Sequence, residues 1–246
     1  MHRFFVTPQQ IMQLIVRFDD DQAHQIRRVL RLRPGDRVLV LDGAGRQYEV
    51  ALEEVTGARV TGLVASQSSA TGEPAVRLTL FQSMLKREKF EWVLQKGTEI
   101  GVHTFAPVIT RRSLVRDTED VKPEKIGRWQ RIIKEAAEQS GRGLLPRLLT
   151  PMPFAAAITE APGFDRTLIA WEGDAQASIR EALAGSGRVE DMGLFIGPEG
   201  GFEPQEVQEA VEMGAIAVTL GRRILRTETA AVVGAALVLH ELGELG

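Results

Sequence analysis

The chain has 246 residues, 43% of them hydrophobic, and a formal net charge of −3 at pH 7. This length and composition suit one large domain, or a small domain joined to a larger one, with a full apolar core. Cysteine is absent, which excludes a disulfide framework and a cysteine-based zinc site. The net charge alone does not indicate a nucleic-acid-binding protein, so that class of function requires clustered basic residues.

No segment of the sequence predicts export or membrane insertion. Arg3 and Arg17 interrupt the apolar residues near the N-terminus, where a signal peptide has a continuous apolar stretch. The longest apolar run near the C-terminus, 230–239, is too short to cross a bilayer. We therefore expect a cytoplasmic protein.

Residues 1–70 predict a small β domain that looks like a barrel. Short apolar runs separated by glycine turns have the length and residue types of strands: 38–41, 47–52 and 59–64. The Gly43-Ala44-Gly45 triplet lies between two of these strands, so we interpret it as a hairpin and not as a dinucleotide-binding turn. The small polar residues of 66–74 predict a linker.

Residues 75–246 predict a larger domain in which strands and helices alternate. The expected strands are 76–80, 104–109, 167–171, 192–196 and 215–220. The expected helices are 86–100, 123–140, 175–183, 204–213 and a last one that begins near Glu228. This alternation predicts the α/β class, with a mainly parallel sheet covered by helices on both faces.

Three loops that follow predicted strands have the composition of a ligand pocket: 170–173, 197–201 and 220–225. Parallel α/β sheets bind ligands at this edge, beyond the carboxyl ends of the strands. The glycines of 197–201 allow the backbone to approach a ligand and leave N–H and C=O groups free, although they could also serve only to turn the chain. Apolar residues would form the walls of the pocket: Ile196, Leu220, Ile224 and Leu225.

Several motifs, taken in order, resemble the bacterial 16S ribosomal RNA uridine-N3 methyltransferases, a family of the SPOUT class of RNA methyltransferases. They are His2-Arg3-Phe4-Phe5, 24–36, 96–102, 135–142, Phe195-Ile196-Gly197-Pro198-Glu199-Gly200-Gly201-Phe202 and 220–230. The resemblance implies an RNA-docking PUA-like β-barrel at 1–70 and a SPOUT domain at 75–246 with a C-terminal trefoil knot. It also implies S-adenosylmethionine as cofactor, a homodimer formed through the C-terminal domain, and 16S ribosomal RNA or the small ribosomal subunit as substrate.

The resemblance and the pocket loops together give a set of expected cofactor-binding residues. S-adenosylmethionine has an apolar adenine with polar edges, a ribose and a sulfonium cation, so it suits an apolar slot lined by backbone groups. The expected residues are Trp171, Glu172, Gly173, Ile196, Gly197, Gly200, Leu220, Gly221, Ile224 and Leu225.

Methylation of uracil N3 requires loss of the N3 proton, so the site needs a group that removes the proton or stabilises the resulting anion. Arg226 could hold the uracil carbonyl oxygens as negative charge develops, and its alternatives are a phosphate contact or an ion pair with Glu199. Glu228 could accept the proton, or could place its charge at the positive end of the last helix. Arg226 and Glu228 are therefore the candidate catalytic residues.

Clustered arginines mark the expected RNA-binding surface, although such clusters are often only solvated surface. The candidates are Arg3, Arg27, Arg28, Arg31, Arg111, Arg112 and Arg142. Lys86, Arg87 and Lys89 are interleaved with Glu88 and Glu91, which favours a solvated helix face for that segment.

The four histidines are scattered without metal-ligand spacing, and methyl transfer from a sulfonium needs no metal, so we expect none. Two other functions remain open at this point. One is a SPOUT enzyme with a different RNA target or acceptor atom. The other is an RNA-binding assembly factor without catalysis, although such a protein has little need for the apolar slot at 220–230.

Overall fold

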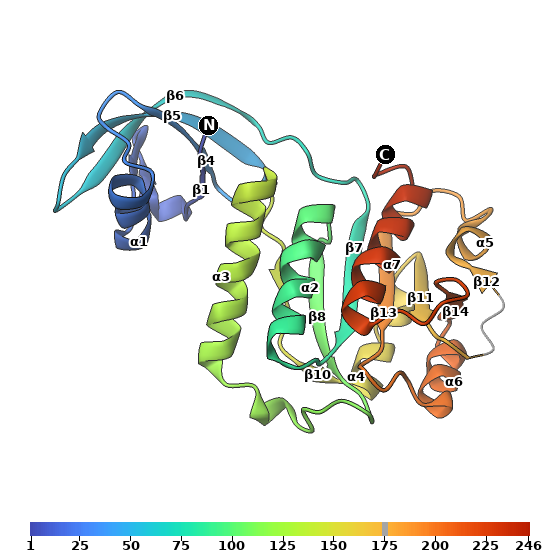
Figure 1. The fold of residues 1–246 in the computed structure, drawn as a ribbon. Coiled ribbons are helices and arrows are strands. Elements are labelled where there is room, and N and C mark those ends of the chain that lie inside the picture. The colour runs from blue at the N-terminus through green and yellow to red at the C-terminus, as the bar shows by residue number, and fades with distance from the viewer. Residues whose placement is uncertain (174–176) are drawn as a thin grey trace. The chain divides into compact units, whose positions relative to one another are not determined.

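A computed structural model describes residues 1–173 and 177–246, with residue 87 described by its backbone alone. Contacts within the chain divide it into two compact units (Figure 1). Unit 1 comprises Met1–Glu73 and Ala137–Leu145, and unit 2 comprises Pro74–Ala136 and Pro146–Gly246. The expected combination of a small β unit and a larger α/β unit is confirmed.

Unit 1 is built on one six-stranded sheet with the order β1-β4-β5-β6-β3-β2. Its strands are β1 (Arg3–Phe5), β2 (Ile11–Met12), β3 (Ile15–Arg17), β4 (Arg37–Leu41), β5 (Arg46–Val55) and β6 (Val60–Ser69). Irregular pairing at two places between β5 and β6 bends the sheet around an apolar core that includes Phe4, Val16 and Val50. The β6 strand continues to Ser69, so the expected linker at 66–74 is wrong over its first residues.

A short helical segment covers part of this core. Turn η1 (Pro8–Gln10) precedes β2, and helix α1 (Asp20–His24) continues as a π-helical turn, η2 (Gln25–Val29). Asp19 caps α1 by accepting the backbone N–H of Gln22, and Ile26 buries its side chain completely in the core. This segment has no clear signal in the sequence, because a five-residue α-helix that continues as a five-residue π-helical turn is too short and too irregular to show a helical period.

Unit 2 contains an eight-stranded sheet in which every strand pairing among the described residues is parallel. Its order is β10-β8-β7-β13-β11-β14-β12, with β9 paired to β8. The strands are β7 (Arg77–Ser83), β8 (Thr104–Ile109), β9 (Arg147–Leu148), β10 (Met152–Pro153), β11 (Arg166–Ala170), β12 (Ala177–Ser178), β13 (Asp191–Ile196) and β14 (Ile216–Thr219). The predicted parallel sheet is therefore confirmed.

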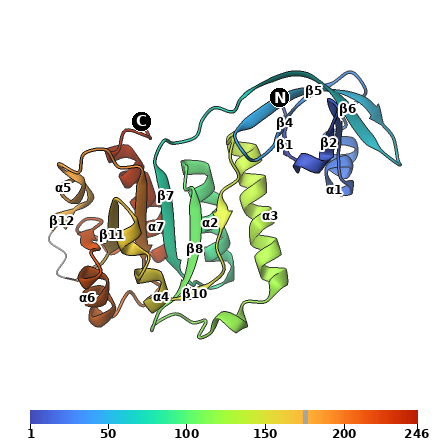
Figure 2. The ribbon, with the colours of Figure 1, turned by 180° about the vertical axis from the view of Figure 1, so that it is seen from behind.

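Helices pack on both faces of this sheet (Figure 2). They are α2 (Arg87–Ile100), α3 (Pro123–Ser140), α4 (Phe154–Ile158), α5 (Ile179–Leu183), α6 (Pro204–Glu212) and α7 (Thr227–Glu241), with turns η3 (Thr118–Asp120) and η4 (Ala161–Gly163). The last residues of α3 belong to unit 1. No helix in the described part of the chain is both long and apolar enough to cross a bilayer.

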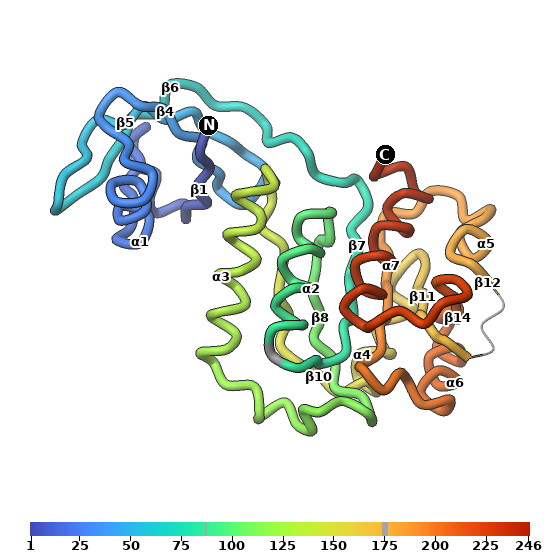
Figure 3. The backbone as a smooth tube through the Cα atoms, viewed as in Figure 1, coloured from blue at the N-terminus to red at the C-terminus, as the bar shows by residue number. Residues whose placement is uncertain are grey.

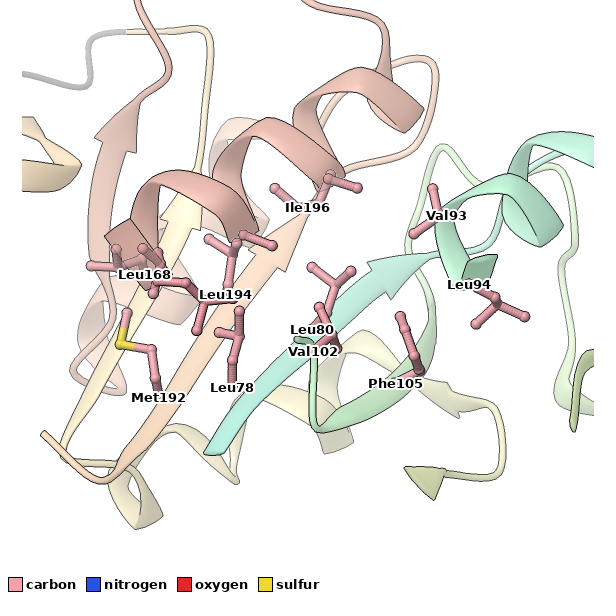
Figure 4. Packing of buried hydrophobic residues seen from close by; sticks show 14 of the residues in the cluster. Leu78, Leu80, Val93, Leu94, Val102, Phe105, Leu168, Met192, Leu194 and Ile196 are labelled. Atoms are coloured by element: carbon pink, nitrogen blue, oxygen red, sulfur yellow. The ribbon is translucent and has the colours of Figure 1, made fainter. Parts of the chain in front are cut away.

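The central strand β13 shows why the sheet is buried on both faces. Leu194 and Ile196 lie in the core cluster that contains residues of α2 and α7, as Figure 4 shows. Phe195, which points to the opposite face, stacks on Phe81 with 4.2 Å between ring centroids and belongs to the cluster of α4 and α6. Alternate residues of one apolar strand thus fill two cores, as expected for a parallel sheet.

The two ends of the sheet differ in their polar groups. At the amino end, Asp165 accepts hydrogen bonds from the backbone N–H groups of Asp191 and Glu190, which lower the pKa of its carboxyl. At the carboxyl end, the neighbouring strands β13, β11 and β14 lead into the three loops expected to form a pocket. Residues 175 and 176 of the expected helix at 175–183 lie outside the described residues, and the described helix begins only at Ile179.

Candidate active site

A cavity of about 310 Å³ lies in unit 2, at the carboxyl ends of β11, β13 and β14. The backbone trace in Figure 3 shows the turns that follow these strands. Residues of the three loops, together with Lys89 from α2, line the cavity. Its volume falls at the small end of the range for small-molecule sites in proteins.

The structure brings most of the expected cofactor residues together around this cavity. Those that line it are Trp171, Glu172, Ile196, Gly197, Leu220, Gly221, Ile224 and Leu225. Gly173 and Gly200 do not line it. A side chain at Gly173 would overlap the Trp171 ring, and the Gly200 carbonyl accepts a hydrogen bond from Arg112 at 2.8 Å. Ile224 is 88% exposed, so it lies at the rim and does not form the enclosed apolar wall that the sequence suggested.

The loop between β13 and α6 owes its shape to close packing of backbone against side chains. Gly201 has a φ of +68°, and a Cβ there would lie only 2.2 Å from the Glu172 carboxylate. Phe202 is buried and packs on Phe154 with 5.5 Å between ring centroids. A Cβ at Gly197 would lie 3.2 Å from the Phe202 backbone nitrogen and ring. The glycines therefore permit packing as well as turning.

The first turn of α7 is tied to the same loop. The Thr227 hydroxyl donates a 2.5 Å hydrogen bond to the Gly197 carbonyl, and the Gln82 side-chain amide lies 3.4 Å from that hydroxyl. Thr227 is buried and also lines the cavity. These contacts hold the β13 loop and the start of α7 in a fixed arrangement around the cavity.

Three charged side chains meet beside the cavity: Lys89, Glu199 and Glu228. The Lys89 ammonium lies 3.5 Å from Glu199 Oε1 and 3.4 Å from Glu228 Oε2. The sequence interpretation of a solvated helix face is therefore wrong for Lys89, while the side chain of Arg87 lies outside the described residues. No helical period could have found this site, because the two carboxylates lie far along the chain, Glu199 in the loop after β13 and Glu228 in the first turn of α7.

Glu228 contacts Lys89 but is not among the residues that line the cavity. Its side chain is 16% exposed, and its Oε2 atom is buried and receives no hydrogen bond from the described residues. Glu228 occupies the first turn of α7, where a negative charge is favourable. Glu228 therefore has the helix-end position expected from the sequence, and it also forms an ion pair with Lys89.

Arg226 lines the cavity at the residue that precedes α7. Its side chain is exposed and takes part in no ion pair with the described part of the chain. The expected alternative, an ion pair between Arg226 and Glu199, is absent from the described contacts, because Glu199 pairs with Lys89. The Arg226 guanidinium is therefore available to a ligand.

Arg222 and Arg223 add positive charge to the rim of the cavity, where both side chains are exposed. They were not among the expected RNA-binding residues, although their place beside a glycine in the 220–225 loop was a usable signal. Around the cavity, the basic residues Lys89, Arg222, Arg223 and Arg226 outnumber the acidic residues Glu172 and Glu199. This excess suits a polyanionic partner.

Comparison with known proteins identifies the family. A family model described as an RNA methyltransferase domain matches residues 72–239, and one described as an RNA methyltransferase PUA domain matches residues 18–63. The chain is 32% identical, over 237 residues, to ribosomal RNA small subunit methyltransferase E of Bacillus subtilis (strain 168), a match that covers 94% of this chain and 93% of that relative. The chain belongs to the ribosomal RNA small subunit methyltransferase E family.

Other members of the methyltransferase E family are also similar to this chain over most of its length. The relative from Synechocystis sp. is 33% identical, over 96% of this chain and 77% of its own. The crystal structure of ribosomal RNA small subunit methyltransferase E from Neisseria gonorrhoeae, bound to S-adenosyl methionine, superposes with a TM-score of 0.85 at 31% identity, covering 98% of this chain and 97% of that chain. This chain therefore shares its mixed α/β fold, with a PUA-like N-terminal unit, with that structure.

The expected RNA-binding arginines of unit 1 differ in their availability. Arg28 and Arg31 are exposed, while Arg3 is half-buried beside Gly141. Arg27 donates to the backbone carbonyls of Thr56 and Gly57, at 2.8 and 2.9 Å, so its guanidinium already has partners. Arg28 and Arg31 are therefore the better candidates for phosphate contacts.

Arg111 and Arg112 follow β8 and contact the start of α6. Arg111 lies 3.2 Å from the Glu203 carboxylate and 2.7 Å from the Gln205 side-chain oxygen, and Arg112 bonds the Gly200 carbonyl. Both side chains remain 45% exposed. These arginines stabilise the β13 loop, and their exposed parts still leave room for an RNA contact.

Arg142 is almost completely buried in unit 1, where it forms a 2.6 Å ion pair with Glu73. Glu73 also accepts the backbone N–H groups of Gly143 and Leu144, at 2.8 and 3.0 Å. This pair fastens the returning segment Ala137–Leu145 to the end of the first segment of unit 1. The burial of Arg142 gives it a structural role in place of the RNA contact expected from the sequence.

Proposed function

We propose that this protein transfers a methyl group from S-adenosylmethionine to N3 of a specific uridine in 16S ribosomal RNA, and that it acts in the cytoplasm on the assembled small ribosomal subunit. The observation that carries the proposal is the cavity at the carboxyl edge of the parallel sheet, lined by three loops and by exposed arginines that form no ion pair with the described residues. The names of its relatives and the S-adenosyl methionine bound to the Neisseria gonorrhoeae protein support it.

The lining of the cavity fits the proposed cofactor. Leu220 and Leu225 offer apolar surface to an adenine, and the backbone at Gly197 and Gly221 offers hydrogen-bonding groups to its polar edge. The Glu172 carboxylate is suited to ribose hydroxyls or to positive charge. When bound, the cofactor supplies an electrophilic methyl group.

Arg226 is proposed to act on the acceptor base. Loss of the N3 proton leaves negative charge on the uracil carbonyl oxygens, and a guanidinium can donate hydrogen bonds to such oxygens in fixed geometry. Arg226 lines the cavity and is free of ion pairs with the described residues, so it meets this need. Glu228 contributes indirectly, through its contact with Lys89 and its charge at the start of α7.

The two parts of the chain are proposed to divide the work, with residues 1–70 docking RNA and residues 75–246 binding the cofactor and catalysing transfer. The exposed arginines Arg28 and Arg31 would contact phosphates on the first part. Arg222 and Arg223 would contact the RNA next to the cavity. A trefoil knot in the second part stays a prediction from the family resemblance.

The reaction product tests the proposed function directly. Small subunits from a strain that lacks this protein should contain no 3-methyluridine at the target position, and purified protein with S-adenosylmethionine should restore it. Nucleoside mass spectrometry of digested 16S ribosomal RNA measures both results. A methylated ribose or another base would show a different acceptor atom, and cofactor binding without any methylation would favour the assembly-factor function.

We further propose a homodimer formed through the C-terminal part of the chain. Helix α7 is apolar on all sides, with Leu237 38% exposed, and Ile224 is almost fully exposed nearby in sequence. Unit 2 by itself leaves these apolar groups in water, which favours a partner surface. Light scattering at micromolar concentration should therefore give about twice the 27.1 kDa mass of one chain. A monomer with full methyl-transfer activity would contradict the dimer.

A further inference from the structure

The ion pairs of Lys89 are longer than the hydrogen bonds that its ammonium can form. Its separations from Glu199 and Glu228 are 3.5 and 3.4 Å, whereas charge-assisted N–H···O bonds are about 2.7–2.9 Å. Among the described residues the Lys89 ammonium donates no hydrogen bond within normal geometry, and it has three N–H donors. The ammonium therefore forms ion pairs with both carboxylates and can still donate a hydrogen bond to a bound molecule.

The cavity reaches Lys89 and Glu199 but not Glu228. Lys89 and Glu199 are each about one-third exposed, so both can meet a bound molecule. Glu228 also contacts the ammonium, and its Oε2 atom is buried. This arrangement presents one donor and one acceptor to the cavity, while a second carboxylate contacts the donor without lining the cavity.

A donor beside an acceptor matches the edge of uracil that carries N3. That edge has an N–H flanked on each side by a carbonyl oxygen, so a carboxylate facing N3–H places a neighbouring ammonium close to a carbonyl oxygen. Cytosine has a lone pair at N3, which a carboxylate would repel. The Lys89–Glu199 pair thus suits the base that must lose a proton from nitrogen.

We propose that Lys89 and Glu199 are further catalytic residues on the methyl-acceptor side of the site, and that Glu228 is a positioning residue for Lys89. This inference rests on the proposed function. Glu199 takes the N3 proton, and the N3 electron pair forms the bond to the methyl carbon. The bond between that carbon and the sulfonium breaks, and its electrons remain on sulfur as S-adenosylhomocysteine. Lys89 donates to the adjacent carbonyl oxygen while charge is on it.

Helix α2 provides a closely matched control for this pair. Lys96 and Glu99 form an ion pair at 2.7 Å whose side chains are 34% and 29% exposed, the same values as for Lys89 and Glu199. Neither Lys96 nor Glu99 lines the cavity. Lys96→Met therefore removes a lysine charge from the same helix as Lys89, and Glu99→Gln removes a carboxylate from an equally exposed ion pair. Neither substitution changes a residue that lines the cavity.

The test measures single-turnover methyl transfer at saturating small subunits and S-adenosylmethionine, with cofactor affinity from calorimetry on the same preparations. Lys89→Met and Glu199→Gln should each slow transfer by about a hundredfold or more, with cofactor affinity unchanged within about threefold. Lys89→Arg should recover to within about tenfold of the wild type because it keeps the charge. Glu228→Gln should slow methyl transfer by about tenfold or less, and both control variants should transfer the methyl group at the wild-type rate.

Three outcomes would overturn the inference. Full transfer by Lys89→Met or Glu199→Gln would remove that residue from the reaction. A loss of cofactor affinity that accounts for the lost rate would make the pair a cofactor-binding element instead. A Glu228→Gln loss as large as that of Glu199→Gln would identify Glu228 as the proton acceptor. Because the wild type is assayed in parallel, a wild-type product other than 3-methyluridine would refute the proposed function itself, which the variant results alone do not.

Discussion

Leu225→Asp should weaken S-adenosylmethionine binding by at least about a hundredfold, which corresponds to about 3 kcal/mol. Leu225 is half-buried and lines the cavity beside Leu220, where we place the adenine. A carboxylate at this position must either lose its hydration beside an apolar ring or keep water in the slot, and both oppose binding. Isothermal calorimetry with S-adenosylmethionine and S-adenosylhomocysteine measures the change.

Val211→Asp is the control for this substitution. Val211 is 47% exposed on α6 and does not line the cavity, so the same charge placed there should leave cofactor affinity unchanged. Gly197→Val attacks the same site by another route, because its side chain would collide with Phe202 and displace the loop. Unchanged titrations for both Leu225→Asp and Gly197→Val, in proteins that melt as the wild type does, would place the cofactor elsewhere.

Much of unit 2 was predictable because its elements are long and periodic. The expected strand 104–109 coincides with β8, a continuous run that is buried almost throughout, and the expected helix 123–140 coincides with α3, whose apolar residues repeat at the helix period. Strands of two or three residues, such as β2 and β3, carry no period and were missed. The return of Ala137–Leu145 to unit 1 depends on Glu73 and Arg142, a pairing between distant parts of the sequence.

The candidate site also contains some residues that the sequence predicts and others that it does not. Backbone loops at the ends of adjacent strands follow from the sheet, so most of the cofactor residues could be named from Gly197, Leu220 and their neighbours. The role of a charged side chain depends on its partners, which sequence spacing does not give. Lys89 was interpreted as surface and Arg142 as an RNA contact, and the carboxylates beside each reverse both interpretations. A knot has no period at all, so only the family resemblance could suggest it.

Arg226→Ala should reduce the rate of the chemical step by roughly a hundredfold or more, with little change in RNA affinity, if its guanidinium stabilises the developing uracil anion. Arg226 belongs to unit 2 and lines the cavity, whereas Arg28 and Arg31 are exposed residues of unit 1. Single-turnover kinetics at saturating small subunits measure the chemical step, and binding titrations over a range of salt concentrations measure RNA affinity.

The double substitution Arg28→Ala and Arg31→Ala should have the opposite signature. Removing two phosphate contacts should weaken RNA binding and flatten the dependence of log K on log salt by up to about two units of slope, since each contact contributes about 0.7 to 0.9. Methyl transfer at saturating RNA should survive, because no group at the cavity is changed. If Arg226→Ala lost only RNA affinity, or if the double variant lost only the saturated rate, the assignment of docking to the N-terminal part and catalysis to the C-terminal part would be wrong. A loss of rate alone in Arg226→Ala, together with a loss of RNA affinity alone in the double variant, would locate the chemistry at Arg226 and the electrostatic contact with RNA at Arg28 and Arg31.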